Sequence, residues 1–267
     1  MKKIIALILA MTLALSLAAC GNAANSKTIK VGTAPGPHAE IMESVKEALA
    51  AEGYTLEIVE FSDYILPNTA LDEGQIDANY FQHITYMNSF NGEHGTHLVS
   101  VAGIHYEPFG LYAGKTASID ALPEGAQIAV PNDATNEARA LLLLEQEGII
   151  KLKEGAGIYA TKDDIVENPL NVEIVETNAE LLTSVLQDVD MAVINGNYAI
   201  AAEMKIADAL AVEAADGTAA EAYVNVITVM AGKENDPKTQ ALVKALTSEA
   251  VRAFMEKTYE GAVVPLF

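Results

Sequence analysis

The feature that most constrains the fold is a regular alternation of short apolar runs with longer segments whose apolar side chains recur at helical spacing. We expect buried strands at 29–33, 56–61, 78–80, 127–130, 172–175, 191–194 and 223–231. We expect helices at 39–51, 65–73, 84–90, 135–147, 179–186, 198–202 and 237–259. Alternating strands and helices form mainly parallel sheets with helices on both faces. The pattern therefore predicts an α/β fold.

The length of the chain is compatible with one large domain or with two lobes of ordinary size. It has 267 residues, of which 51% are hydrophobic and only 9 are proline, so a sizeable core can form. The segments 110–113 and 223–226 read as extended, and we expect them to connect two lobes.

The N-terminus has the layout of a secretory signal peptide, with Met1-Lys2-Lys3 before an apolar run at 4–17. The following Leu17-Ala18-Ala19-Cys20 resembles a bacterial lipobox, in which cleavage exposes a cysteine that is then acylated. An uncleaved membrane anchor is disfavoured, because the run is shorter than the roughly 20 residues that cross a bilayer. A buried structural thiol is not expected at the boundary between an apolar leader and a polar stretch.

These features predict a signal peptide at 1–19 and a linker at 20–27 that begins with the acylated cysteine. We expect the acyl chains to attach the protein to the extracytoplasmic face of the cell membrane. Because Cys20 is the only cysteine, the exported part forms no internal disulfide and depends on its core.

The charge of the chain excludes one class of partner. The formal net charge is −21, whereas binding to nucleic acid requires a basic surface. The same balance argues against a polybasic membrane-binding patch. The acidity is best explained as a contribution to solubility.

Motifs for catalysis or for cofactor binding are weak or absent. The chain contains neither a Gly-x-Ser-x-Gly elbow nor a Walker phosphate-binding loop. The segment Gly155–Ala160 superficially matches a dinucleotide fingerprint, but no buried strand precedes it. His94 and His97 approach the spacing of metal ligands, but they lie in a polar loop without other clustered ligands. We therefore expect no cofactor and no metal.

Arg139 is a candidate for binding an anionic ligand. It is one of only two arginines, with Arg252, and it falls near the start of a predicted helix, where a cation opposes the helix dipole. One interpretation is an ion pair with Glu137 or with another of the many carboxylates on a solvated face. The other is a guanidinium fork that holds a ligand carboxylate through two parallel hydrogen bonds.

Two aromatic clusters follow predicted strands. The first is 61–64, and the second is 77–86, where a strand leads into a helix. Ligands of open α/β sheets lie beyond the carboxyl ends of the strands, so both clusters are candidates for a ligand site. For Phe81 in particular, ordinary core packing is the alternative.

Several blocks of the sequence resemble the methionine-binding lipoprotein family of the NlpA/MetQ type. They are Pro35–Glu40, Asp77–Asn79 with Phe81–His83, Ile128–Glu137, Asp190–Ala199 and Gly261–Pro265. The resemblance implies a two-lobed periplasmic-binding-protein fold, type II-like, with lobe I at 28–112 plus 225–267 and lobe II at 113–224. It also implies capture of methionine between the lobes and delivery to an ABC permease and its ATPase.

The resemblance further implies a set of ligand-binding residues. The family's aromatic pocket matches Tyr64, Phe81, His83 and Tyr86, its carboxylate-binding arginine matches Arg139, and the asparagines at the polar end of the ligand match Asn195 and Asn225. Methionine suits such a pocket, because aromatic rings contact its polarizable sulfur favourably.

Other functions remain compatible with the residues. A pocket of this kind could prefer a methionine-containing dipeptide or another small apolar amino acid. A secreted hydrolase that uses Asp63 or Asp77 together with His83 is an alternative of another class. A surface adhesin with a vestigial pocket is a third.

Overall fold

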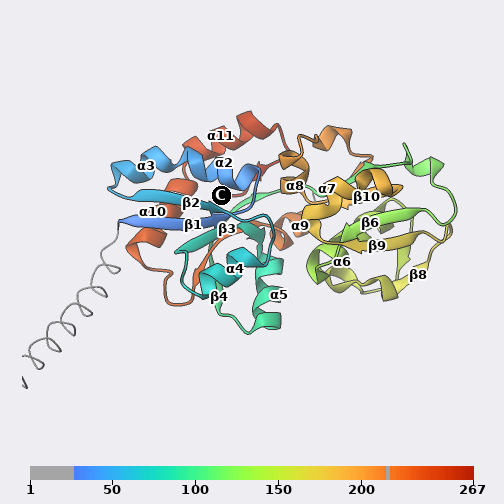
Figure 1. Cartoon of the computed structure of the whole chain (residues 1–267), viewed down its shortest axis with the longest axis horizontal. Coiled ribbons are helices and arrows are strands. Elements are labelled where there is room, and N and C mark those ends of the chain that lie inside the picture. The colour runs from blue at the N-terminus through green and yellow to red at the C-terminus, as the bar shows by residue number, and fades with distance from the viewer. Residues whose placement is uncertain (1–26, 215–216) are drawn as a thin grey trace, which may run out of the picture.

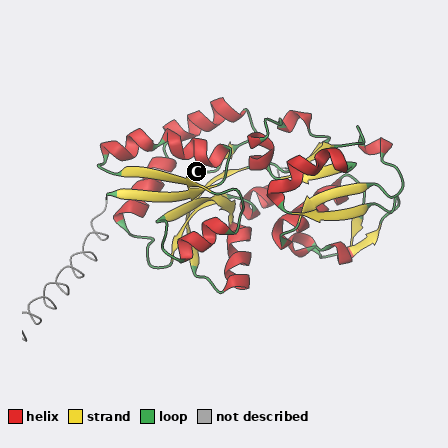
Figure 2. Cartoon of the chain, in the orientation of Figure 1, coloured by secondary structure: helices red, strands yellow, loops and turns green. Residues whose placement is uncertain are grey.

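The computed structural model describes residues 27–214 and 217–267, and these residues form two lobes that lie side by side (Figure 1). Each lobe has its own β-sheet, with helices packed around it (Figure 2). The two-lobed α/β fold expected from the sequence is therefore confirmed. The expected signal peptide and Cys20 lie outside the described residues.

Lobe I is built on a six-stranded sheet with the strand order β13-β4-β12-β3-β1-β2. Its strands are β1 (Thr28–Thr33), β2 (Thr55–Glu60), β3 (Ala78–His83), β4 (Leu98–Tyr106), β12 (Asn225–Met230) and β13 (Val264–Pro265). Its helices are α2 (Pro37–Ser44), α3 (Lys46–Ala51), α4 (Leu66–Asp72), α5 (Ile84–His94), α10 (Pro237–Leu246) and α11 (Glu249–Tyr259).

Lobe II is built on a five-stranded sheet with the order β11-β5-β10-β6-β9. Its strands are β5 (Gly110–Ala113), β6 (Gln127–Pro131), β9 (Glu173–Thr177), β10 (Met191–Ile194) and β11 (Ala211–Val212), beside a small pair of β7 (Lys151–Leu152) and β8 (Ile165–Glu167). Its helices are α6 (Ala134–Gln146), α7 (Leu182–Val185) and α8 (Gly196–Ala201), and α9 (Gly217–Ala222) precedes the return to lobe I. Short 3-10 turns lie at Ile119–Ala121, Gly157–Tyr159, Lys162–Asp164, Ala179–Leu181, Leu186–Asp188 and Ile206–Asp208.

The sheets contain more antiparallel pairing than the alternating sequence pattern predicts. Strands β1, β2 and β3 pair in parallel, as do β6, β9 and β10. In contrast, β12 runs antiparallel to β3 and β4, and β5 runs antiparallel to β10 and β11. These additional strands flank the places where the chain passes between the lobes, and they are not joined by the strand-helix-strand connections that make neighbours parallel.

Two of the expected long helices are each divided into two. The segment expected at 39–51 forms α2 and α3 with a break at Val45, and the one expected at 237–259 forms α10 and α11 with Ser248 in an extended conformation between them. Ser248 is a favourable residue to precede a helix. Apolar periodicity continues across such a break, so it does not reveal the division.

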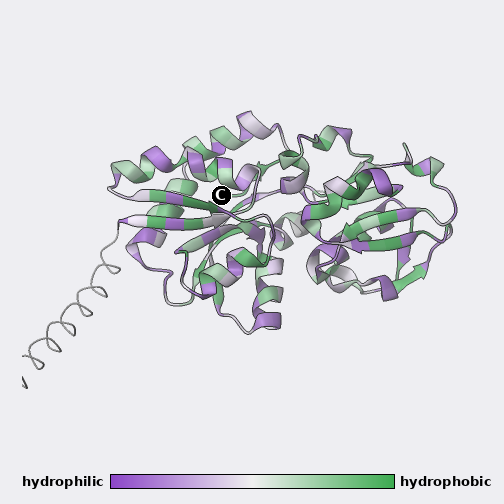
Figure 3. Cartoon of the chain, viewed as in Figure 1, coloured by the Kyte–Doolittle hydropathy of each residue, from purple (hydrophilic) through white to green (hydrophobic). Residues whose placement is uncertain are grey.

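The buried apolar residues form separate clusters in the two lobes, two in each, and the strands of both lobes are largely hydrophobic (Figure 3). In lobe I the core includes Ile29, Val31 and Ile104, and in lobe II it includes Ile128 and Leu141. Two separate cores allow the polar groups between the lobes to form a site without interrupting either core.

The first connection between the lobes lies earlier than expected. Strand β5 belongs to the sheet of lobe II, so the chain crosses at 107–109 and not at 110–113. The expected boundary of lobe I after residue 112 is corrected accordingly. The chain re-enters the lobe I sheet at Asn225, the first residue of β12.

Gly36 allows the two lobes to approach closely. It has a φ of 85°, and a Cβ atom there would lie 2.7 Å from the backbone oxygen of Asn197 in α8 of lobe II. A side chain at this position would therefore meet both backbone strain and a clash with the other lobe.

We predict that Gly36→Ala lowers the free energy of unfolding more than Gly53→Ala does. Gly53 has a similar φ of 83°, but a Cβ atom added there would meet nothing within 4 Å, so its substitution carries only the left-handed strain of about 1–2 kcal/mol. Urea unfolding of both variants measures the difference. Equal destabilisation would show that the Gly36 contact between the lobes is not formed in solution.

Candidate functional site

All seven residues expected to bind a ligand line one cavity between the lobes. Lobe I contributes Tyr64 before α4, Phe81 and His83 from β3, Tyr86 from α5 and Asn225 from β12, while lobe II contributes Arg139 from α6 and Asn195 at the start of α8. The remaining lining residues are Gln82, Glu107, Asn136, Gly196 and Asn197. The sequence thus predicted which residues lie together.

The pairing of β12 explains how distant parts of the chain meet here. Asn225 lies opposite His83 of β3 and opposite His105 of β4. The carboxyl end of β3 and the beginning of β12 therefore face the crossing that follows β4.

An aromatic wall closes one side of the cavity. The ring of Tyr64 lies 5.8 Å from that of Phe81 and 5.8 Å from that of Tyr86, measured between centroids. Phe81 and Tyr86 are buried, and the Tyr86 hydroxyl donates to the backbone oxygen of Tyr64 at 3.2 Å. Tilted and edge-on rings of this kind form a rigid apolar surface.

A polar network on the lobe II side links three residues of the cavity. Asn195 Nδ2 donates to Asn136 Oδ1 at 3.0 Å, and His83 Nε2 of lobe I lies 3.2 Å from the same oxygen. Asn136 Nδ2 donates to both carboxylate oxygens of Asp133, at 3.0 and 2.9 Å. Asp133 also caps α6 by accepting from the backbone N–H of Asn136.

A second polar network lies on the lobe I side. His38 Nε2 is 2.9 Å from Asn225 Oδ1 and 3.6 Å from Glu107 Oε1. His105 Nε2 is 2.7 Å from the same Glu107 oxygen, and its Nδ1 contacts the hydroxyl of Tyr80. All of these side chains are buried.

The group His38, His105 and Glu107 also has the composition of a metal site, with potential ligand atoms within 4.8 Å of one another. Hydrogen bonds among these residues and to Asn225 and Tyr80 already satisfy their buried polar atoms, except His38 Nδ1. The hydrogen-bonded arrangement therefore accounts for this cluster.

Arg139 is paired with a carboxylate of the protein itself. Its Nε donates to Glu213 Oε2 at 2.8 Å, and its Nη2 donates to Glu213 Oε1 and to the backbone oxygen of Glu107, the latter at 2.7 Å. The expected pairing with a carboxylate of the chain is present, but the partner is Glu213 and the pair is almost fully buried instead of solvated. The fork formed by Nε and Nη2 is therefore already occupied. Among the described residues, Nη1 has no hydrogen-bond partner.

The ion pair keeps both of its members charged despite their burial. Burial alone would raise the pKa of Glu213, but the charge of Arg139 and its hydrogen bonds hold that pKa below its usual value. Likewise, burial would raise the pKa of Glu107, but His38, His105 and Arg139 hold it below its usual value. Arg139, Glu213 and Glu107 thus contribute one cation and two anions beside the cavity, in addition to the Asp133 carboxylate that holds Asn136.

Two polar atoms of the cavity are buried without a partner. They are Asn195 Oδ1 and Asn197 Nδ2, one an acceptor and the other a donor. An unsatisfied buried polar atom costs about 1–3 kcal/mol. The cavity is therefore suited to a ligand that carries both a donor and an acceptor at one end.

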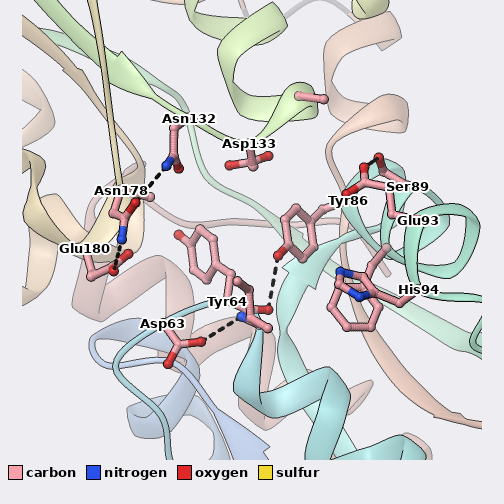
Figure 4. Close-up of a pocket in the computed structure, with 14 residues that line it drawn as sticks. Asp63, Tyr64, Tyr86, Ser89, Glu93, His94, Asn132, Asp133, Asn178 and Glu180 are labelled. Carbon is pink, nitrogen blue, oxygen red and sulfur yellow. Dashed lines mark hydrogen bonds between the residues drawn. The ribbon is translucent and has the colours of Figure 1, made fainter.

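A second hollow, here called the outer hollow because several of its lining residues are exposed, is also lined from both lobes (Figure 4). Tyr64 and Tyr86 line both hollows, so they form the wall between them. Asp63, Glu93, Asp133 and Glu180 also line this outer hollow, which is therefore acidic.

The pairing required by the hydrolase alternative is not formed. Asp63 accepts hydrogen bonds from the backbone N–H groups of Ile65 and Leu66 at the start of α4, and Asp77 pairs with Lys238. His83 contacts Asn136 and the backbone of Tyr86 instead of either carboxylate.

Several residues of the site were not predicted from the sequence. Asn136 and Asn197 lie within the blocks that carry the family resemblance, close in sequence to Arg139 and Asn195. Glu107 and Glu213 lie outside those blocks, and nothing distinguishes them among the 37 acidic residues of the chain. Only the fold shows that these two carboxylates are buried.

Comparisons with known proteins show the family of the chain. The family model described as NlpA lipoprotein matches residues 29–267. The chain belongs to the NlpA lipoprotein family. The resemblance seen in the sequence is thereby confirmed.

Similar structures and relatives cover almost the whole chain. A putative lipoprotein from Ruminococcus gnavus is 55% identical, with a TM-score of 0.89 over 91% of this chain and 100% of that one. A nutrient binding protein from Burkholderia cenocepacia bound to methionine is 45% identical, with a TM-score of 0.84 over 90% and 100%. The D-methionine-binding lipoprotein MetQ of Salmonella typhimurium is 41% identical over 256 residues, which are 94% of this chain and 93% of the relative.

Relatives in this family are named as membrane lipoproteins or as substrate-binding proteins. Within residues 27–214 and 217–267, no helix of this NlpA-family chain is long and apolar enough to span a bilayer.

The folded protein keeps two imidazoles neutral well below their ordinary pKa. Burial lowers the pKa of His38 to about 4, and burial together with the charge of Arg139 lowers that of His83 to about 3. The unfolded chain binds protons at both side chains below about pH 6.5. By linkage, these two imidazoles therefore contribute a decrease in the free energy of unfolding as the pH falls from about 6.5 towards 4.

We predict that His83→Gln makes this decrease shallower, because it removes one of the two groups that gain a proton only on unfolding. Urea unfolding at about pH 7, 6 and 5 measures the slope. His97→Gln, at an exposed position, is the control and should leave the slope as it is. An unchanged slope in His83→Gln would contradict the neutral, buried state of this imidazole.

Proposed function

We propose that this chain is a lipid-anchored, extracytoplasmic solute-binding protein that captures methionine between its lobes and delivers it to an ABC permease and its ATPase. The proposal is supported by family membership and by relatives and neighbours that are named for methionine binding. The contacts of the cavity residues in this chain support it further.

The observation that carries the proposal is the unpartnered pair Asn195 Oδ1 and Asn197 Nδ2 beside an aromatic wall. The ammonium of an amino acid donates hydrogen bonds and its carboxylate accepts them. One zwitterion can therefore satisfy both atoms. The wall then receives the side chain of the same molecule.

A methionine side chain fits the aromatic wall on physical grounds. Burying it contributes about 1.5–3 kcal/mol, and each contact of its sulfur with an aromatic ring adds about 0.3–1.5 kcal/mol. Tyr64, Phe81 and Tyr86 provide three rings within 6.3 Å of one another. The side chain is unbranched, so it can lie along these rings without a clash at Cβ.

The buried charges favour one orientation of the ligand. The Glu107 carboxylate borders the cavity beside Gly196, where a Cβ atom would lie 2.9 Å from Glu107 Oε2. This anion and Asn195 Oδ1 would bind the ammonium. The ligand carboxylate would accept from Arg139 Nη1 and from side-chain amides, because Glu213 already occupies the other edge of the guanidinium.

Capture would proceed by closure of the lobes over the ligand. In the present arrangement Tyr64 donates to Asn197 Oδ1 at 2.5 Å, and Tyr198 of lobe II donates to the backbone oxygen of Ser62 at 2.9 Å. Both bonds join the segment 62–64 of lobe I to α8 of lobe II, beside the cavity. Closure excludes water and strengthens the polar contacts with the ligand, and the closed shape would be what the permease recognises.

Attachment to the membrane would come from acylation of Cys20, after cleavage of the leader. The extracytoplasmic location follows from the same leader. The mass of the N-terminal peptide from natively purified protein would report the acyl chains directly.

We predict that the domain beginning at Gly21 binds methionine more tightly than it binds the other standard amino acids or glycyl-methionine. The ligand should also be recovered chemically intact after prolonged incubation. Isothermal titration calorimetry followed by mass spectrometry measures both. Absence of methionine binding, or conversion of the ligand, would overturn the proposed function.

In the same titration, Asn195→Ala should weaken methionine binding about 10- to 100-fold, because a hydrogen bond to a charged group contributes about 1.5–3 kcal/mol. Asn132→Ala is the matched control. Asn132 lines the outer hollow, where its side chain is exposed and donates to Asn178. Its substitution should leave the affinity unchanged.

A further inference from the structure

The cavity asparagines could in principle present either end of their amides to a ligand. The oxygen and the NH2 group have almost the same shape but opposite hydrogen-bonding roles. A site that distinguishes ammonium from carboxylate must therefore fix which end of each amide faces the ligand. The neighbours of Asn195 and Asn225 show how this is done.

A carboxylate determines the orientation of Asn195 through one intervening residue. Asp133 has only acceptors, so Asn136 must direct its NH2 group towards it, at 2.9 and 3.0 Å. Asn136 Oδ1 then faces Asn195, which must donate its own NH2 group to it. The carbonyl oxygen of Asn195 is consequently left facing the cavity.

The imidazole of His83 supports the same orientation of Asn136. Its Nδ1 accepts the backbone N–H of Tyr86 at 3.0 Å. A neutral imidazole with an unprotonated Nδ1 carries its proton on Nε2, so Nε2 donates to Asn136 Oδ1. Two donors thus converge on that oxygen.

A different carboxylate determines the orientation of Asn225. His38 Nε2 faces Glu107 Oε1 at 3.6 Å and Asn225 at 2.9 Å, whereas Nδ1 has no partner. The nearby anion favours the proton of a neutral imidazole on Nε2. His38 therefore donates to Asn225 Oδ1, and the NH2 group of Asn225 is directed to the cavity.

Asn197 lacks such a determinant. Its Oδ1 accepts from the hydroxyl of Tyr64, and a hydroxyl can donate or accept with equal ease. The orientations of Asn195 and Asn225, in contrast, each depend on a carboxylate, which cannot change its role while it is ionised.

We propose that Asp133 and His38 are positioning residues that give the two ends of the site opposite polarity. Asp133 acts through Asn136 to turn the oxygen of Asn195 towards the ligand ammonium, and His38 holds Asn225 so that its NH2 group faces the ligand carboxylate. The proposal rests on the proposed binding of an amino acid. It adds the residues that enforce the direction in which the zwitterion is bound.

The test uses three ligands with the same thioether side chain: methionine, methioninol, which lacks the carboxylate, and 4-(methylthio)butanoate, which lacks the ammonium. Asp133→Asn should weaken the binding of methionine and methioninol about tenfold or more, with little effect on 4-(methylthio)butanoate. His38→Leu should weaken methionine and 4-(methylthio)butanoate by a similar factor and methioninol much less.

Two further variants separate positioning from general stability. His38→Gln retains an amide N–H near the position of Nε2 and should restore most of the methionine affinity lost in His38→Leu. Asp236→Asn makes the same change at the start of α10, where Asp236 also caps a helix, and should affect none of the three ligands. Equal weakening of all three ligands by Asp133→Asn or by His38→Leu would overturn the proposal.

A ligand-free measurement distinguishes failure of this proposal from failure of the proposed function. Nitrogen-15 NMR of the unliganded protein should show His38 protonated at Nε2 and unprotonated at Nδ1, with the signals assigned by their loss in His38→Gln. The opposite tautomer would overturn the proposal even if methionine binds. The expected tautomer without any methionine binding would support the role of His38 and reject the ligand.

Discussion

The buried ion pair between Arg139 and Glu213 is the interaction on which the site depends. Glu213 follows the last strand of lobe II, and it also accepts hydrogen bonds from the Tyr106 hydroxyl and from the backbone N–H of Phe109 at 3.0 Å. The pair therefore ties α6 to the segment that connects the lobes. Removing one member would leave the other as an unpaired buried charge, which is strongly destabilising. Because Glu213 occupies Nε and Nη2, only Nη1 of the guanidinium is left to contact a ligand.

The pair explains why the cavity suits a zwitterion better than a simple anion. Arg139 is neutralised within the protein, and Glu107 adds a further negative charge beside the cavity. An ammonium group is attracted to that charge, whereas a carboxylate without an ammonium would meet a site with an excess of negative charge. The aromatic wall adds selectivity for the side chain but cannot distinguish an amino acid from its uncharged analogues.

Much of this arrangement could be predicted from the sequence, because the apolar periodicity and the family blocks are local features. They located β1, β6 and β10, as well as seven of the residues that line the cavity. The partner of Arg139 could not be predicted in this way, because Glu213 is 74 residues away in sequence and resembles any other surface glutamate. The breaks at Val45 and Ser248 were also missed, since the apolar pattern continues across them. The features that the sequence does not predict depend on long-range pairing and on burial, and only the fold determines these.

A crystal structure of the domain with methionine bound would test the central claim most directly. We predict that Arg139 Nε and Nη2 remain on Glu213 while Nη1 contacts the ligand carboxylate. We also predict that the ammonium lies beside Asn195 Oδ1 and Glu107, and that the thioether lies against Tyr64, Phe81 and Tyr86. A ligand carboxylate that displaces Glu213 from the guanidinium, or a ligand bound with its two charged ends exchanged, would contradict this binding mode.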